Sequence, residues 1–205
     1  NKKAYGFQEV IIETPHPNVT LGSLGVEQIE RLLTLYARRT AALMKKPRIE
    51  YILCLKNQGP ASGASINHAH SQVIALSMLP PDLAEEARRA NAYHSEHQRS
   101  FYADLIGREM KSPRRIFENS EIAVYAPYAS AYHYEAWIMS KRRIDNVTRL
   151  TRNERAAIAK ALKTILCELD RRGLDYNFFC HQVVSNRHQH FCLKIQPREN
   201  IWGGL

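Results

Sequence analysis

One segment of the chain combines histidines, amides and small residues in a pattern that suits phosphoryl chemistry. Residues 57–72 read NQGPASGASINHAHSQ. If a strand begins at His68, its period of two places His68, His70 and Gln72 on one face. Three aligned polar side chains are costly to bury unless each has a partner, so this face is a candidate site.

The residue types indicate what this site would do. A neutral imidazole attacks a phosphorus atom when its other ring nitrogen is held by an acceptor, which fixes the tautomer. The preceding loop contains Gly63 and other small residues, so its backbone N–H groups can approach an anion closely. Ser65 and the Gln72 amide are candidates to stabilise charge on phosphate oxygens. Covalent capture of the phosphoryl group predicts ping-pong kinetics.

A pair of histidines spaced H-x-H has simpler interpretations when it stands alone. It is then usually a solvent-exposed or internally satisfied pair on a strand, or a weak metal site. Gly63, Ser65 and Gln72 at these offsets favour the phosphoryl interpretation.

The elements that would position this segment recur once along the chain. The periodicity predicts, in the first half, strands at 9–13, 49–55 and 68–76, a helix at 26–44, and a polar, helix-prone stretch from Pro80 to about Met110. In the second half it predicts strands at 115–118, 122–126, 136–139, 176–180 and 190–195, and a helix at 152–172 that begins with a Thr151–Glu154 capping box.

Both halves run helix, strand, loop and then a strand that begins with histidine. Tyr51 corresponds to Tyr176, and His68 corresponds to His190. This order predicts an internal duplication of an α+β module with antiparallel strands, and we expect the modules to span residues 1–110 and 111–205.

The length, charge and hydrophobicity of the chain limit the kinds of protein it can be. The chain has 205 residues and a net charge of +9, and we see no apolar run near the ~20 residues of a membrane span. The excess of Lys and Arg over Asp and Glu has three possible explanations: binding of nucleic acid, binding of small phosphorylated substrates, or helix faces that are simply exposed to solvent. The chain shows no signal peptide and opens almost at once on a strand without an initiator methionine, so we expect further residues upstream. 

The four cysteines contain no C-x-x-C pair. Cys54, Cys167 and Cys180 lie in apolar runs, whereas Cys192 follows the second histidine segment. This predicts buried, reduced thiols and a cytoplasmic protein.

Segment 57–72 resembles the active-site motif of galactose-1-phosphate uridylyltransferases and related nucleotide-sugar phosphorylases, in the histidine-triad superfamily. It is most similar to the H-x-H-S-Q version of ADP-glucose phosphorylases. The resemblance extends over nearly the whole chain, through segments 6–15, 121–127, 134–137 and 197–204.

The resemblance implies a fold and a reaction. The fold is α+β, with two tandem histidine-triad-like modules in one subunit, usually a homodimer whose partner helps to build each active site. His70 is the nucleophile that carries the nucleotidyl group, and Asn57, Ser65 and Gln72 contact the phosphates beside the Gly63 loop. The nucleotide comes from a nucleotide sugar of the UDP-glucose or ADP-glucose class, and a hexose 1-phosphate accepts it. The alternative is a phosphorylase whose acceptor is inorganic phosphate.

The resemblance also implies a structural zinc. In the family its ligands are an upstream C-x-x-C, a histidine after the first strand and the first histidine of H-x-H. The corresponding residues are His16, one place early after Thr14-Pro15, and His68, while the C-x-x-C is absent from this sequence. The alternative for His16 is an ordinary surface turn residue.

Some members of the family hold iron, and the matching positions here are Glu86, His181 and His190. The second H-x-H has become His190-Phe191-Cys192, next to a displaced His188-Gln189-His190. Cysteine can bind metal, so the site is either altered or vestigial, with Glu86 then a plain helix-surface carboxylate.

Two further interpretations remain. The aromatic residues near the strand ends either line a sugar or base pocket or belong to the core: Tyr125, Tyr128, Tyr132, Tyr134 and Trp137. The chain could also be a basic binding module without catalysis, which would show strongly salt-dependent binding to oligonucleotides. That hypothesis gives no reason for the polar face from His68 to Gln72, so we expect no nucleic-acid or membrane partner.

Overall fold

The computed structural model describes residues 5–185 and 188–199, so the similarity at Ile201–Gly204 lies outside the described residues. The strands are β1 (Gly6–Ile12), β2 (Tyr51–Gln58), β3 (His70–Leu76), β4 (Arg115–Glu118), β5 (Ile122–Tyr125), β6 (Ala136–Ser140), β7 (Asp175–His181) and β8 (Cys192–Arg198). The helices are α1 (Val26–Leu43), α2 (Pro81–His97), α3 (Phe101–Glu109) and α4 (Arg152–Arg171).

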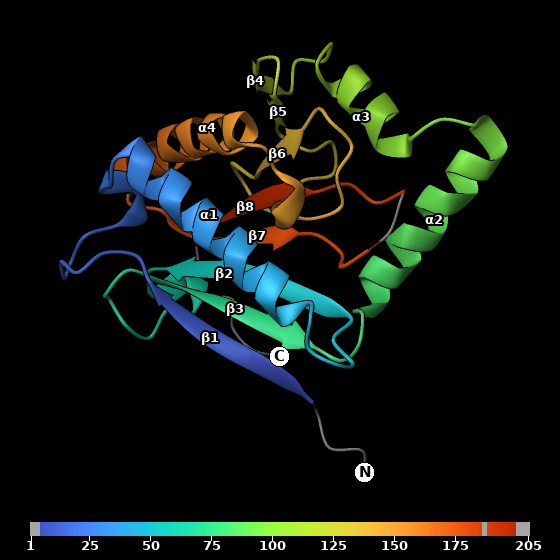
Figure 1. Ribbon diagram of the computed structural model, residues 1–205. Helices are drawn as coiled ribbons and strands as arrows, with labels where there is room; N and C mark the ends of the chain where they lie inside the picture. Colours follow the sequence, from blue (N-terminus) through green and yellow to red (C-terminus); the bar gives the residue numbers. More distant parts are fainter. Residues whose placement is uncertain (1–4, 186–187, 200–205) are drawn as a thin grey trace, which may run out of the picture.

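The eight strands form one antiparallel sheet in the order β1-β3-β2-β7-β8-β6-β5-β4. The order reflects the predicted duplication, because β1-β3-β2 on one side of the centre is matched by β6-β8-β7 on the other. Helix α1 joins β1 to β2, and α4 occupies the same place between β6 and β7 (Figure 1). The predicted α+β fold with two tandem histidine-triad-like modules is confirmed, and the modules share one sheet through the β2–β7 pair.

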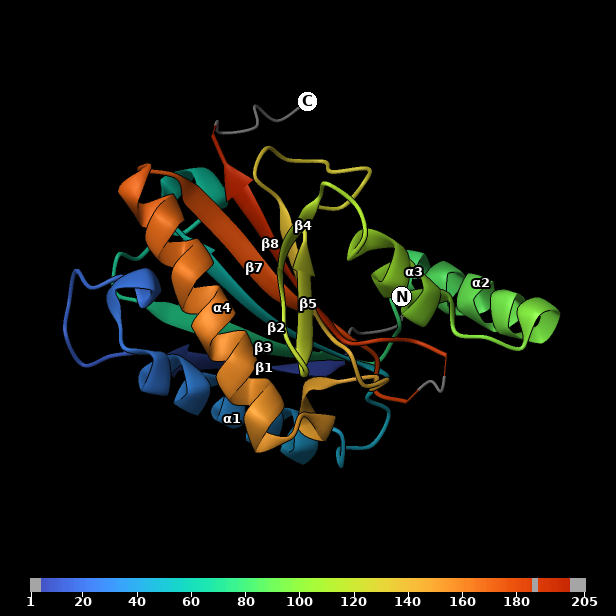
Figure 2. The same cartoon turned by 90° about the horizontal axis from the view of Figure 1, so that it is seen from above.

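Helices cover the two faces of the sheet unequally. α1 and α4 pack together over one face, where alternate residues of the strands, such as Cys54, Val73, Phe178 and Leu193, are buried. α2 and α3 lie on the other side of the sheet (Figure 2) and bury Ala123, Tyr125, Met139 and Cys192 in the second half. Among the residues that the structure describes, no helix cluster of this kind covers the first-half strands on that second face, and we call this part the open face.

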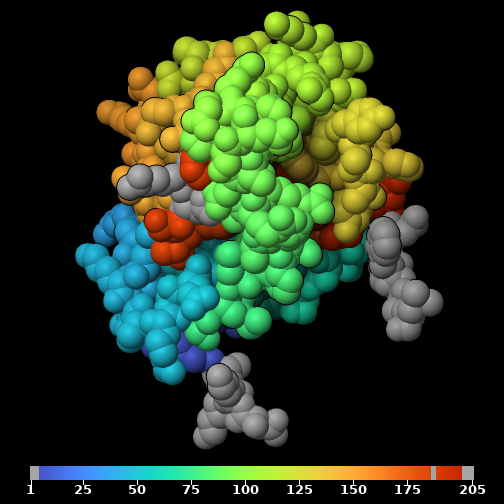
Figure 3. Space-filling model, turned by 90° about the vertical axis from the view of Figure 1, so that its right-hand side faces the viewer, coloured from blue at the N-terminus to red at the C-terminus, as the bar shows by residue number. Residues whose placement is uncertain are grey.

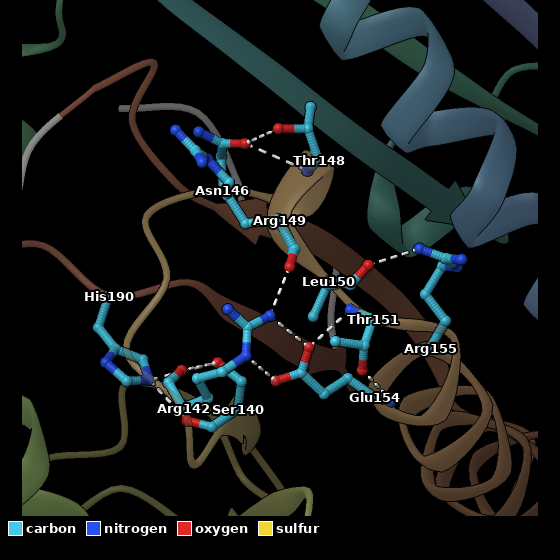
Figure 4. A network of polar contacts seen from close by, with 10 residues as sticks. All are labelled: Ser140, Arg142, Asn146, Thr148, Arg149, Leu150, Thr151, Glu154, Arg155 and His190. Carbon is cyan, nitrogen blue, oxygen red and sulfur yellow. Dashed lines mark hydrogen bonds and ion pairs between the residues drawn. The ribbon is translucent and has the colours of Figure 1, made fainter.

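Local sequence signals explain how α4 begins and ends. The Thr151 hydroxyl accepts from the Glu154 backbone N–H at 3.2 Å, and the Glu154 carboxylate accepts from the Thr151 N–H at 2.7 Å, which is the predicted capping box (Figure 4). Arg142 donates two hydrogen bonds to the same carboxylate. At the other end Gly173 has φ +67°, the left-handed conformation that ends many helices.

Four details of the predictions need correction. The strand expected from His68 begins at His70, and the strand expected from His190 begins at Cys192. The long helix-prone stretch is two helices, because Gln98 adopts φ +53° and the Ser100 side chain then caps α3. Cys167 is exposed on α4, whereas Cys54, Cys180 and Cys192 are buried as free thiols.

Among the described residues, no helix has both the length and the apolar character needed to cross a bilayer.

Candidate active site

The imidazole of His70 is held in one orientation by the backbone beside it. Its Nδ1 lies 2.8 Å from the carbonyl oxygen of His68. Since a carbonyl only accepts, Nδ1 carries the proton and Nε2 keeps its lone pair. The ring is half-buried on the open face, at the first residue of β3. This is the tautomer that a nucleophilic histidine requires.

His68 does not lie in the strand with His70 and Gln72, although the strand period predicted that it would. It lies two residues before β3, and it contributes its carbonyl to His70 rather than a side chain on the same strand face. Its own Nε2 donates to the carbonyl of Thr14 at 2.6 Å. Gln72 does share the face of His70, because both are in β3 two residues apart. The Gln72 Oε1 accepts from Gln8 at 2.7 Å, so its amide NH₂ is turned away from that bond.

The loop between β2 and β3 is fastened to the second half of the sheet. Gly59 has φ +81°, and a Cβ there would lie 1.8 Å from an Asp175 carboxylate oxygen. The other Asp175 oxygen accepts from the Ala61 N–H at 2.6 Å. Gly63 also has a positive φ, +85°, but its surroundings are open, with only the Asn57 amide nitrogen 3.9 Å from a built Cβ. The loop therefore leaves room beside Gly63.

Asn57 presents an amide donor to this room. Arg198 Nε donates to Asn177 Oδ1 at 2.6 Å, which fixes the amide of Asn177. The Asn177 Nδ2 then donates to Asn57 Oδ1 at 2.7 Å and to the Ser62 carbonyl at 2.9 Å. Because its oxygen is occupied, Asn57 directs its Nδ2 toward Gly63.

The structure thus brings most of the predicted phosphate contacts to one region. The β2–β3 ladder ends at the pair of Leu55 and Gln72, and Asn57 and His70 each lie two residues beyond that pair toward the connecting loop. Ser65 lies exposed in the loop between them. Their direct contact with substrate stays a prediction.

Sequence reasoning missed the residues that support this site. Asn177 and Arg198 lie on β7 and β8, far away in the chain. Lys56 and Glu13 form a buried ion pair of 2.8 Å on the face opposite His70. A signal for Lys56 was present, since the strand period that buries Ile52 and Cys54 also places Lys56 on the covered face.

The predicted zinc ligands do not complete a metal site within the described residues. His68 Nε2 is engaged by Thr14, and the His16 backbone N–H donates to the Thr14 hydroxyl at 3.2 Å. No group of three or more His, Cys, Asp or Glu side chains that could hold a metal forms in the part of the chain that the structure describes. Zinc binding stays a prediction.

Of the three residues matched to iron, the structure joins two. His181 Nε2 lies 2.6 Å from Glu86 Oε2, so Glu86 is not a plain surface carboxylate. Burial alone would raise the pKa of Glu86, but the hydrogen bond from His181 and its charge bring that pKa below the usual value. His190 is directed elsewhere, with Nε2 donating to the Ser140 carbonyl at 2.6 Å (Figure 4). Burial lowers the pKa of His190 and favours its neutral form.

A cavity of about 500 Å³ lies between the α2–α3 pair and the second half of the sheet. Figure 3 shows α2, in green, lying across this side of the molecule. Tyr125, Tyr128 and Trp137 line the cavity as one interpretation predicted, whereas Tyr132 and Tyr134 stack with Arg198 and Arg172 instead. His70 is not among its lining residues, so the cavity is separate from the His70 site.

Three comparisons show which known proteins this chain is similar to. The model of the galactose-1-phosphate uridyl transferase N-terminal domain matches residues 1–80. The chain is 28% identical to ADP-glucose phosphorylase of Arabidopsis thaliana over 98% of its length and 58% of that protein. It is 25% identical to galactose-1-phosphate uridylyltransferase of Thermotoga maritima, over 96% of the chain and 64% of the relative.

A solved structure shows that the likeness includes the fold. The structure of ADP-glucose phosphorylase from Arabidopsis thaliana with bound ADP-glucose has a TM-score of 0.88 at 26% identity, and it covers 98% of this chain and 66% of that one. The chain spans about three fifths of the length of the two curated relatives. With a family model on its first 80 residues, relatives along nearly its whole length and this shared fold, the chain is similar to galactose-1-phosphate uridylyltransferases and to ADP-glucose phosphorylase.

Proposed function

We propose that the protein is a nucleotidyltransferase that takes a nucleoside monophosphate from a nucleotide sugar onto His70. The observation that carries the proposal is the hydrogen bond between His70 Nδ1 and the His68 carbonyl, which leaves Nε2 as the free nucleophile. The open loop at Gly63 and the Asn57 amide beside it support a phosphate position next to that ring.

The proposed reaction consists of two displacements. In the first, the Nε2 lone pair of His70 forms a P–N bond to the α-phosphorus, the bond from that phosphorus to the bridging oxygen breaks, and the sugar 1-phosphate leaves. In the second, a phosphate oxygen of the acceptor attacks the same phosphorus, and the P–N bond breaks. The neutral amides of Asn57 and Gln72 and the loop N–H groups would stabilise the charge on the equatorial oxygens.

Two acceptors fit this scheme. A hexose 1-phosphate would make the protein a galactose-1-phosphate uridylyltransferase-like enzyme, which the uridylyltransferase relatives support. Inorganic phosphate would make it a nucleotide-sugar phosphorylase, which the similarity to ADP-glucose phosphorylase supports equally.

The test is covalent labelling of the purified protein with UDP-glucose and, separately, ADP-glucose, each labelled in the α-phosphate. We expect acid-labile, base-stable label on wild-type protein from one of the two donors, and none above background in His70→Ala. His97→Ala, a change at an exposed histidine of α2, is the matched control and should label like wild type. Wild-type protein that takes label from neither donor contradicts the proposal.

The labelled protein then identifies the acceptor. Chase with glucose 1-phosphate or galactose 1-phosphate should release a nucleotide sugar if the protein is a uridylyltransferase-like enzyme. Chase with inorganic phosphate should release a nucleoside diphosphate if it is a phosphorylase. The more rapid of the two releases decides between the activities.

Three further properties belong to this proposal: a cytoplasmic location, a homodimer and a zinc ion bound with the help of His16 and His68. They rest on the family resemblance and on cysteines that are free in the structure. Sedimentation velocity of the purified protein tests the dimer, and elemental analysis for zinc tests the metal.

A further inference from the structure

A buried ion pair lies directly behind the strand that carries His70. Lys56 Nζ and Glu13 Oε2 are 2.8 Å apart, and their side chains are 1% and 0% exposed. Removing two charges from water is costly, and a buried pair often contributes no more stability than apolar residues of the same size. Its presence here therefore calls for a role other than simple stabilisation.

The pair and its neighbour contact every residue of the segment that sets the nucleophile. The Glu13 N–H donates to the Ala69 carbonyl at 3.0 Å, and the Ser71 hydroxyl donates to the Glu13 carboxylate. Lys56 Nζ donates to the His70 carbonyl at 3.3 Å. Thr14, next to Glu13, accepts from His68.

Strand pairing holds this segment on the β1 side only, where Ile11 pairs with Ser71 and Ile12 with His70. The β2–β3 register ends at the pair of Leu55 and Gln72, one residue after Ser71. Glu13 and Ala69 make a ladder bond, so the alternation of antiparallel pairing turns the His70 carbonyl away from β1 and toward β2. There the Lys56 ammonium replaces the missing strand donor.

The pair acts through the backbone and not on the reacting atoms. Lys56, Ser71 and Glu13 are buried on the face that α1 covers, whereas the His70 ring lies on the open face. The described hydrogen bonds join the pair to the backbone of Ala69 and His70, to the Ser71 hydroxyl and to the Gln28 amide, and none of them joins it to the imidazole.

We propose that Lys56 and Glu13 are positioning residues that fix the peptide groups of residues 69–71, so that His70 Nδ1 stays on the His68 carbonyl and Nε2 stays aimed outward. The catalytic consequence rests on the function proposed above. A displacement of about 1 Å in a reacting group costs roughly 10²-fold in rate, so a modest loosening of this segment is measurable.

The test variant is Lys56→Met combined with Glu13→Gln. It removes both charges without leaving one unpaired, keeps an acceptor for Ser71, and loses the bond to the His70 carbonyl. The matched control is Arg39→Met combined with Glu9→Gln, which neutralises the ion pair between α1 and β1, at 41% and 28% exposure, where Glu9 pairs with Val73 and not with His70. Lys56→Arg retains the charge and donor.

Two measurements are made on these proteins. The first is the single-turnover rate of His70 labelling at saturating nucleotide sugar, together with the concentration at half-saturation. The second is the tautomer of His70 by ¹⁵N NMR without substrate, which needs no activity. For the charge-free pair we expect a rate about 10- to 100-fold lower, an unchanged half-saturation concentration and a mixture of His70 tautomers. The control and Lys56→Arg should remain near wild type.

The outcomes separate the two proposals. A folded charge-free variant with wild-type rate and a wild-type tautomer overturns the positioning role. Wild-type protein that never takes label overturns the proposed function, while the tautomer comparison still decides the role of the pair. If the charge-free variant does not fold, the alternative variant is Ser71→Ala, which removes the hydrogen bond from the Ser71 hydroxyl to the Glu13 carboxylate. It should slow labelling several-fold, and an unchanged labelling rate also overturns the positioning role.

Discussion

His70 has a counterpart in the second module that cannot do the same chemistry. His68 and His190 each lie two residues before a strand and place Nε2 against a backbone carbonyl. The position equivalent to His70 is then Cys192, the first residue of β8. Burial raises the pKa of the Cys192 thiol to about 12, so it remains protonated and poorly nucleophilic. The duplicated framework therefore holds the proposed nucleophile, His70, in the first module, and a buried thiol at the equivalent position of the second.

At the residue scale, Gly59 should be intolerant of any side chain. Gly59→Ala would put a Cβ at φ +81° against Asp175, which must move and release the Ala61 N–H. We expect a loss of about 2–4 kcal/mol in the free energy of unfolding, from backbone strain and one lost hydrogen bond. Urea unfolding measures it.

Gly107→Ala is the matched control, because Gly107 lies within α3 with no atom within 4 Å of a built Cβ. It should raise the unfolding free energy by up to about 1 kcal/mol through helix propensity. Equal effects of the two substitutions would show that the Gly59 conformation is not the cause.

Among the elements, α4 is stabilised both by its buried face and by interactions at its first turn. Its buried residues are Ile158, Leu162, Leu166 and Leu169, and each contributes about 1.5–3 kcal/mol when fully removed from water. Burial alone would raise the pKa of Glu154, but hydrogen bonds from Arg142 and Thr151 bring it below the usual value. The carboxylate thus stays charged at the positive end of the helix dipole.

Thr151→Ala should cost about 1 kcal/mol of unfolding free energy, since it removes the acceptor of the Glu154 N–H. Thr164→Ala tests the same chemical change at an exposed interior position of α4, where the hydroxyl donates only to the Lys160 carbonyl. That variant should be as stable as wild type or slightly more stable. Thermal or urea unfolding of both proteins decides the matter, and a Thr151→Ala protein as stable as Thr164→Ala would show that the cap is not significant.

For the molecule as a whole, the two modules are joined across the centre of one sheet. The β2–β7 ladder pairs Leu55 with Phe179 and Gln58 with Tyr176, and the Asn57–Asn177 bond crosses the same line. Asp175 fastens the first module's loop to the second. The candidate phosphate site therefore depends on residues from both halves of the chain.

This arrangement predicts that the halves open together. In native-state hydrogen exchange, amides of β2 and β7 should show opening free energies equal to within about 1 kcal/mol, and edge strands β1 and β4 should exchange faster. If the β7 amides open with a free energy more than about 2 kcal/mol below that of β2, the modules unfold independently.

The sequence by itself determined the elements, the duplicated order and the segment that carries His70. Hydrophobic period, the Thr151–Glu154 box and the glycines are local signals, so helices α1 and α4 and most strands agree with prediction to within a few residues. The family resemblance implied that Asn57, Gly63, Ser65 and Gln72 contact the phosphates, which stays a prediction, and these residues lie in or beside the segment that joins β2 to β3.

Only the tertiary structure decided how His70 is held and by what. β3 begins at His70 and not at the predicted His68, and His68 Nε2 is bonded to Thr14, two residues after the end of β1, a contact that no local pattern reveals. Asn177 and Arg198 orient Asn57 from 120 and more residues away, through a chain of hydrogen bonds. Lys56 and Glu13, 43 residues apart, become partners only when β1 and β2 enclose β3. The spacing of residues along a strand specifies which face of the sheet a side chain lies on. Contacts between distant strands depend on which strands are neighbours in the sheet, and that is decided by the tertiary structure.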